Sequence, residues 1–140
     1  KHSASLQRIQ IIKGSITNSG ARPSEKVFDV VCSDGLEVDP TTHRCPDNGA
    51  RVNIEDCSIT SNVGATELKA TWRDPEFNPK DKAFYYVRVL ENPTCRWSTW
   101  DALKAGIKPR SDLHETIQER AWSSPIWYIP VPEDIDIFAL

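Results

Sequence analysis

Hydrophobic and polar positions alternate along several short segments of this chain. The alternation is clearest in residues 66–73 (TELKATWR) and is also present in residues 6–12 (LQRIQII). A period of two places successive side chains on opposite faces, so each segment is predicted to form a half-buried β-strand. The hydrophobic sides of these strands carry Ile9, Ile11, Leu68, Ala70 and Trp72. The polar neighbours Lys69 and Thr71 are expected to be more exposed.

Two further segments are rich in β-branched and aromatic residues, which favour strands. They are residues 27–32 (VFDVVC) and 83–90 (AFYYVRVL). The second segment is hydrophobic almost throughout, which is typical of a central strand. The residues expected to face inward from it are Tyr85, Val87 and Val89, while Arg88 is expected to be more exposed.

One short helix is predicted in the second half of the chain. Ser98 or Thr99 can cap the segment WDALKA, and Asp101 would lie favourably in its first turn. Gly106 can end the helix, because glycine adopts the left-handed conformation at low cost.

Residues 116–128 (TIQERAWSSPIWY) predict a last pair of strands, which Pro125 interrupts. Five or six short strands separated by turns predict an all-β fold. We expect an Ig-like antiparallel β-sandwich with one short helix in a long insertion and a loop-rich disulfide region. A length of 140 residues predicts a single domain, residues 1–140.

The four cysteines, Cys32, Cys45, Cys57 and Cys95, contain no Cys-x-x-Cys pair of the kind that structural zinc sites use. Their even number predicts two disulfides in an exported protein, either periplasmic or secreted. We prefer Cys32–Cys45, which closes a loop rich in Asp, Gly, Pro and Thr. Cys57–Cys95 would then fix the two following tryptophans over the core. Pairing Cys45 with Cys57 and Cys32 with Cys95 stays open.

Charge and hydropathy remove some classes of function. The formal net charge is −3, so the chain lacks the basic footprint of nucleic-acid binders. No run approaches the roughly 18 apolar residues of a membrane span, so we expect no membrane insertion. The chain contains no methionine, even at position 1, which we interpret as a processed chain or a fragment.

Motifs for metal binding and catalysis are weak. The three histidines form no metal-binding pair. SDLH (111–114) is a D-x-H triplet, but no second histidine cluster lies near it, so a solvated loop is favoured. We therefore predict no enzyme activity, no cofactor and no catalytic or metal residue. Calcium binding stays open for the carboxylates of the cysteine loops, which are Asp34, Glu37, Asp39, Asp47, Glu55 and Asp56.

Tryptophans are concentrated around the connection between residues 90 and 120. We expect a docking or ligand surface there, because tryptophan offers a large apolar area and one N–H donor. Packing against another domain is favoured, and stacking on a carbohydrate is the alternative. The residues of this predicted surface are Arg96, Trp97, Trp100, Trp122 and Trp127.

Three long segments carry a resemblance to a known family. AFYYVRVLENPTCRWSTWDA, TIQERAWSSPIWY and CSDGLEVDPTTHRCPDNGA are similar to the C-terminal portion of bacterial proteins in the family called domain of unknown function 3604. The resemblance covers nearly the whole chain. It implies a C-terminal module excised from a larger protein. The N-terminal part of full members is similar to the polymerase-and-histidinol-phosphatase (PHP-like) superfamily of metal-dependent phosphoesterases. The resemblance implies that this domain is the module's partner.

Three functional hypotheses follow. The first is a non-catalytic accessory module that packs on the phosphoesterase-like domain of its parent. The second is a binding module that uses its tryptophans on carbohydrate. In the third, the module completes the parent's active site with Arg96, Asp112 or His114.

Overall fold

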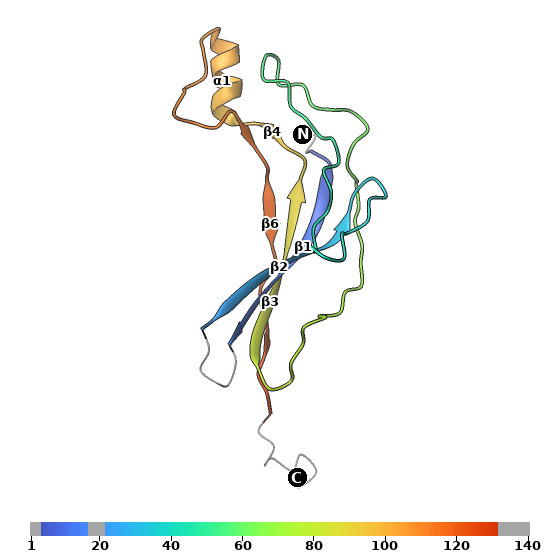
Figure 1. Cartoon of the computed structure of the whole chain (residues 1–140). Coiled ribbons are helices and arrows are strands. Elements are labelled where there is room, and N and C mark those ends of the chain that lie inside the picture. The colour runs from blue at the N-terminus through green and yellow to red at the C-terminus, as the bar shows by residue number, and fades with distance from the viewer. Residues whose placement is uncertain (1–3, 17–21, 132–140) are drawn as a thin grey trace.

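The computed structural model describes residues 4–16 and 22–131 and shows an elongated molecule with α1 at one end (Figure 1). Its main element is a five-stranded antiparallel sheet in the order β2-β1-β3-β6, with β7 also paired to β3. The strands of this sheet are β1 (Leu6–Ile16), β2 (Ser24–Cys32), β3 (Lys82–Glu91), β6 (Arg120–Trp122) and β7 (Ile126–Tyr128). A two-stranded ribbon and one helix complete the fold, namely β4 (Thr94–Cys95), β5 (Thr116–Ile117) and α1 (Trp97–Ala105).

The predicted fold class is confirmed. The described chain is mostly β, its strand pairs are antiparallel, and it contains one short helix and two disulfides. The more specific Ig-like sandwich is compatible with this arrangement and stays a prediction. The predicted strands 27–32 and 83–90 are parts of β2 and β3, and the segment 116–128 supplies β5, β6 and β7.

The expectation that the first strand is half-buried was wrong. β1 lies between β2 and β3, and both of its faces are covered over its central part. Ile12 is fully buried on the same face as Gln10, and Lys13 is buried on the opposite face. Alternation in the sequence therefore marked the strand correctly but gave no sign that polar side chains are buried in it.

Residues 66–73 do not form a strand. The segment is extended but lacks sheet pairing. Its alternation is partly kept, because Leu68 and Trp72 are half-buried, whereas Lys69 and Thr71 are exposed; Ala70, expected to be buried, is exposed. The Trp72 ring packs on Phe28 and Tyr85, at centroid distances of 5.2 and 6.4 Å. One side of this segment contacts the sheet face through side chains, without backbone pairing. The β3 residues Tyr85, Val87, Arg88 and Val89 are all half-buried.

The segment 66–73 belongs to a long connection, residues 33–81, that runs beside the sheet (Figure 1). Its disulfides are Cys32–Cys45 and Cys57–Cys95, which is the pairing preferred from the sequence. Leu6 and Ala65 also exchange two backbone hydrogen bonds of 2.8 and 2.9 Å. In the chain-entropy model, closing loops of these lengths contributes about 3 kcal/mol for the first disulfide and about 4 kcal/mol for the second.

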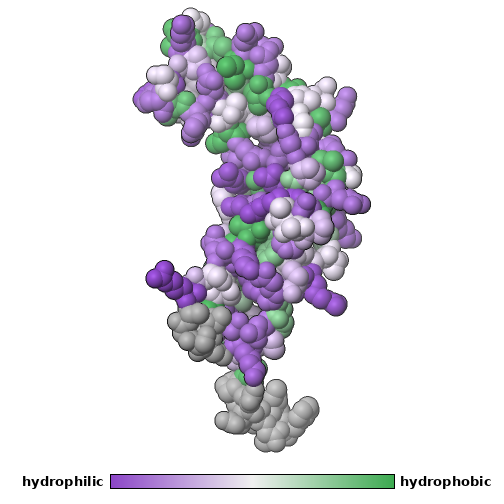
Figure 2. All heavy atoms as spheres, in the orientation of Figure 1, coloured by the Kyte–Doolittle hydropathy of each residue, from purple (hydrophilic) through white to green (hydrophobic). Residues whose placement is uncertain are grey.

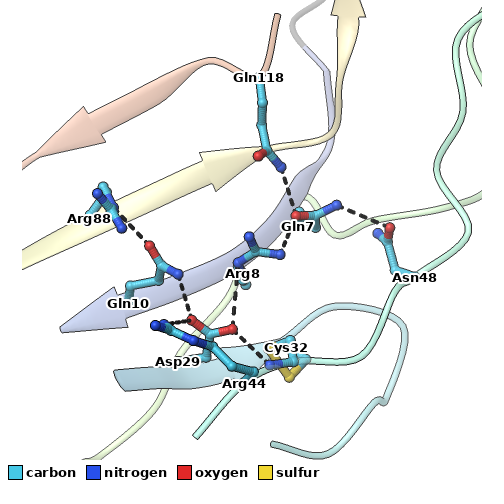
Figure 3. A network of polar contacts seen from close by, with 10 residues as sticks. Gln7, Arg8, Gln10, Asp29, Cys32, Arg44, Asn48, Arg88 and Gln118 are labelled. Atoms are coloured by element: carbon cyan, nitrogen blue, oxygen red, sulfur yellow. Dashed lines mark hydrogen bonds and ion pairs between the residues drawn. A yellow bond between two sulfur atoms is a disulfide. The ribbon is translucent and has the colours of Figure 1, made fainter. Parts of the chain in front are cut away.

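A buried carboxylate on β2 joins this connection to the sheet (Figure 3). The side chain of Asp29 is only 1% exposed. It accepts hydrogen bonds from Gln10 Nε2 on β1 at 2.6 Å and from the backbone N–H of Cys45 at 2.7 Å. The guanidinium groups of Arg8 and Arg44 each lie 3.6 Å from it. One carboxylate therefore links two strands and the connection, with its charge compensated.

Four amide side chains extend this polar network. Gln7 on β1 accepts a hydrogen bond from Gln118 Nε2 at 2.7 Å and donates one to Asn48 Oδ1 at 3.2 Å (Figure 3). Asn48 in turn donates to Asn92 Oδ1 at 2.9 Å, and buried Asn92 donates to the carbonyl of Val63 at 2.9 Å. The network thereby ties the ends of β1 and β3 to two points of the long connection.

A third polar link lies on the face that Trp72 covers. Lys13 Nζ on β1 is 2.6 Å from Asp74 Oδ2 and also donates to the carbonyl of Glu76 at 2.8 Å. Tyr85 on β3 donates its hydroxyl hydrogen to Asp74 at 2.7 Å. Burial raises the pKa of Asp74, but the hydrogen bonds from Lys13 and Tyr85 outweigh it and hold that pKa below its usual range.

Replacing Asp29 by asparagine is expected to destabilise the protein by about 2 kcal/mol. Breaking a buried ion pair costs about 3–5 kcal/mol, and the partial exposure of Arg8 and Arg44 reduces that figure. Urea unfolding followed by tryptophan fluorescence measures the change. The matched control is Asp101→Asn on the exposed face of α1, which should shift stability by less than about 0.5 kcal/mol. Equal effects of the two substitutions would contradict the role of Asp29.

Asp74→Asn should make the stability difference from the wild type depend on pH. The folded-state pKa of Asp74 is depressed, so its ion pair contributes fully above the unfolded pKa near 4. This contribution disappears as the pH falls through the folded pKa. We expect a difference of about 2 kcal/mol at pH 7 that shrinks steadily below pH 4. Urea titrations at several pH values measure it, and a constant difference would refute the assignment.

Candidate functional site

The predicted aromatic surface is exposed but divided between the two ends of the molecule. Trp97 and Trp100 on α1 are 72% and 42% exposed, Trp122 on β6 is 60% exposed, and Trp127 on β7 is 67% exposed. The expectation that Trp97 and Trp100 close over the core was therefore wrong. The residues that α1 buries are Thr99 and Ala102.

The position of α1 also differs from the prediction. The helix begins at Trp97, its N-cap is Arg96 in an extended conformation, and no side chain caps it. Thr99 donates its hydroxyl hydrogen to the carbonyl of Glu115 at 2.7 Å instead of capping the helix. Its first turn contains no acidic residue, so Asp101 lies further along. Gly106 ends the helix as predicted, with a φ of 67°.

A groove lies where the ribbon β4–β5 meets β6. It has a volume of about 430 Å³. The residues that line it are Arg96, His114, Thr116, Ile117, Gln118, Glu119, Arg120 and Trp122. Of the predicted surface, Arg96 and Trp122 meet here. The sequence analysis missed Arg120, although its spacing from Trp122 within a predicted strand places both side chains on one face.

The other end of the sheet presents a hydrophobic edge at β7. This strand lies between Pro125 and Pro130 and pairs with β3 on one side. Ile126 and Trp127 are 72% and 67% exposed, and Ile129 directly after the strand is also exposed. The strand therefore offers apolar side chains on both faces of the sheet. We call residues 126–129 the β7 edge.

A ring stack on one face positions Trp127. Its ring lies 5.3 Å from that of Phe84, its partner across the β3–β7 pair. Phe84 covers Gly14 on β1, where an added Cβ would clash with Phe84 Cε1. Gly14 therefore allows the ring to lie against the sheet. The sequence analysis missed Phe84 because it treated the alternate positions of the strand as inward.

On the other face, Ile126 borders a cleft with Phe77 and Tyr128. The rings of Phe77 and Tyr128 meet edge to face at 4.9 Å, and the Tyr128 hydroxyl donates to the carbonyl of Pro79 at 3.1 Å. Trp72 and Tyr85 also line this cleft. On the face shown in Figure 2, hydrophobic residues form small areas separated by hydrophilic ones.

The acidic residues of the cysteine loops are used in turns. Asp39 accepts backbone hydrogen bonds from Thr41 and Thr42, and Asp56 accepts one from Ser58. Within residues 4–16 and 22–131, no group of three or more His, Cys, Asp or Glu residues is placed to hold a metal ion. The hydrogen bonds from Thr42 and Thr41 lower the pKa of Asp39, and those from Ser58 lower the pKa of Asp56.

Two more of these carboxylates have charged or long-range partners. The hydrogen bond from Arg51, together with that from the Gly49 backbone N–H, lowers the pKa of Asp47 to about 2. Asp34 accepts from the Gly64 backbone N–H at 2.8 Å and so tethers the long connection. The Asp47 oxygens therefore serve the Gly49 backbone and Arg51, and those of Asp34 serve the Gly64 backbone, Ser33 and Asn48.

The residues proposed to complete an active site are only partly brought together. Arg96 and His114 line the same groove. Asp112 forms an exposed ion pair with Arg110 at 2.6 Å and does not line that groove.

These features define an all-β, disulfide-bonded chain with exposed tryptophans on α1, β6 and β7. The chain belongs to the family described as "Protein of unknown function (DUF3604)", whose model matches residues 1–130. No curated protein and no solved structure matches the chain. In the described part of the chain, no helix has the length and apolar character needed to cross a membrane. The two disulfides indicate an oxidising compartment.

Gly14→Ala is expected to destabilise the protein by about 1–3 kcal/mol, because the new methyl group displaces the Phe84 ring. In the background of Phe84→Ala, the same substitution should cost close to nothing. A double-mutant cycle of unfolding free energies measures this coupling. Additive effects of the two substitutions would show that Gly14 is not needed for the position of Phe84.

Proposed function

We propose that this chain is a non-catalytic accessory module of a larger exported protein, in which the β7 edge docks on a metal-dependent phosphoesterase-like domain of the same protein. The observation that carries the proposal is the exposure of Ile126 and Trp127 on a strand at the edge of the sheet. Family membership and the two disulfides support it.

The chemistry of the β7 edge supports a specific partner. Exposed apolar side chains that border clefts are typical of interaction surfaces, since their burial releases water from both partners. The strand is only three residues long, and Pro125 and Pro130 flank it. A short edge flanked by prolines discourages pairing with further copies of the same strand. The edge is thereby suited to one defined contact through side chains.

The proposal of a non-catalytic role rests on how the polar groups are used. The buried carboxylates Asp29 and Asp74 are both neutralised by cations and bind neighbouring segments of the chain. His114 lies on the surface, with no carboxylate hydrogen bond among the described residues. A general base needs a partner that orients it and a reacting group within reach.

In a second candidate function, the groove between the β4–β5 ribbon and β6 completes the active site of the parent protein. Arg96 and His114 line one groove and are the residues that could complete a parent's active site. In that case the groove, and not the β7 edge, would face the phosphoesterase-like domain. The two proposals therefore place opposite ends of the module against the partner.

A protease site inserted ahead of the module in a longer family member tests the docking proposal. After cleavage, the wild-type module should still co-elute with the remainder in size-exclusion chromatography. Ile126→Asp with Trp127→Asp should abolish co-elution, because two charges would be buried in an apolar contact. The matched control is Trp97→Asp, which changes an equally exposed tryptophan at the other end and should leave co-elution unchanged.

Activity measurements on the same proteins separate the two candidate functions. Hydrolysis of a generic phosphoester by the longer protein should be unaffected by Arg96→Ala and His114→Ala if the module is accessory. A loss of kcat in these variants, with co-elution unaffected by the β7 substitutions, would contradict docking through the β7 edge and support the second candidate.

A further inference from the structure

Arg120 and Trp122 form a short cationic and aromatic row on β6. They are separated by one residue, so their side chains project from the same face, about 7 Å apart along the strand. Both residues are exposed. Their partners across the β3–β6 pair are Leu90 and Arg88. β6 is an edge strand, and its pairing with β3 holds the row in place.

Arg96 reaches the same groove from a fixed backbone. Its preceding residue Cys95 is buried, pairs with Thr116 in the ribbon and is bonded to Cys57. The Arg96 backbone N–H donates to the carbonyl of Glu115 at 2.9 Å. The Cys57–Cys95 disulfide and the β4–β5 ribbon thus fix the backbone of Arg96, which lines the same groove as β6.

The two arginines are available to a ligand. Four arginines elsewhere have acidic partners; these are Arg8, Arg44, Arg51 and Arg110. The guanidinium groups of Arg96 and Arg120 have no hydrogen bond or ion pair within residues 4–16 and 22–131. Glu119 is the one carboxylate lining the groove, so cationic side chains exceed anionic ones there.

We infer that this groove binds an anionic saccharide, with its carboxylate or sulfate groups on Arg96 and Arg120 and a sugar ring against Trp122. Guanidinium groups form paired, charge-assisted hydrogen bonds with such anions. The exposed indole offers an apolar face for the C–H groups of a sugar ring. A neutral saccharide would leave both arginines without a partner. A nucleic acid is disfavoured because its binding depends on many phosphate contacts, and the arginines that line the groove are only Arg96 and Arg120.

The groove includes Arg96, the N-cap residue of α1, and lies toward the Leu90 end of β3, whereas β7 pairs with the Ala83 end of the same strand. The inference therefore does not rest on the docking proposal. A module docked through β7 would still present this groove to solvent, and the disulfides are consistent with a compartment that contains polysaccharides.

Isothermal titration calorimetry on the purified protein tests the inference with three oligosaccharides of equal length: an oligogalacturonate, a sulfated oligosaccharide and a neutral glucose oligomer. At least one anionic probe should bind, and the neutral one should bind at least tenfold more weakly. Tighter binding of the carboxylated or of the sulfated probe identifies the preferred anion. Arg96→Ala, Arg120→Ala and Trp122→Ala should each weaken binding about tenfold or more.

Two matched controls locate the site. Arg73→Ala removes an exposed arginine from the cleft beside β7, and Trp97→Ala removes an exposed tryptophan outside the groove lining. Neither should change affinity. The groove substitutions are at exposed or half-buried positions, and unchanged urea unfolding confirms that each variant is folded. No binding of either anionic probe, equal binding of the neutral probe, or full affinity in the Arg96→Ala, Arg120→Ala double variant would overturn the inference.

Discussion

The connection of residues 33–81 must be held against the sheet although it forms no extended sheet of its own. Fixing so long a segment is entropically costly, and its buried hydrophobic residues are few: Ala50 and Cys57. Covalent and polar links replace the missing apolar packing. The two disulfides shorten the free lengths of chain, and the buried carboxylates Asp29 and Asp74 each join the connection to two strands.

This constraint bears on where the proposed interaction surfaces lie. Trp72 and Asp74 of the connection cover part of one face of the sheet, and the polar network occupies the region around Gln7 and Asp29. We propose that the ends of the molecule remain for contacts with partners. At one end, the Cys57–Cys95 disulfide that secures the connection also fixes the backbone before Arg96. At the other, Ile126 and Trp127 of the β7 edge stay exposed, although Phe77 and Pro79 of the connection contact Tyr128. Stability and surface therefore depend on the same links.

Much of the strand content could be predicted, because β2 and β3 are dense in residues that favour strands and Gly106 ends the helix by a local conformational rule. Residues 66–73 were misassigned because alternation reports which side chains face a surface, not whether the backbone pairs. Trp97 was misplaced because hydrophobic size suggests burial, whereas the helix buries Thr99 through its bond to Glu115. Pairings such as Lys13 with Asp74, far apart in sequence, have no local signal. Arg120, which lines the groove, could have been identified from strand periodicity, because it lies two positions before Trp122 in a predicted strand.

Hydrogen exchange of the β7 amides tests docking of the module most directly. The measurement compares a longer family member with the 140-residue chain purified on its own. The account predicts that the amides of Ile126–Tyr128 exchange more slowly in the longer protein, while those in the centre of β1 exchange equally in both. Equal exchange at β7 in the two forms, or added protection at β6 and Arg96 instead, would contradict it.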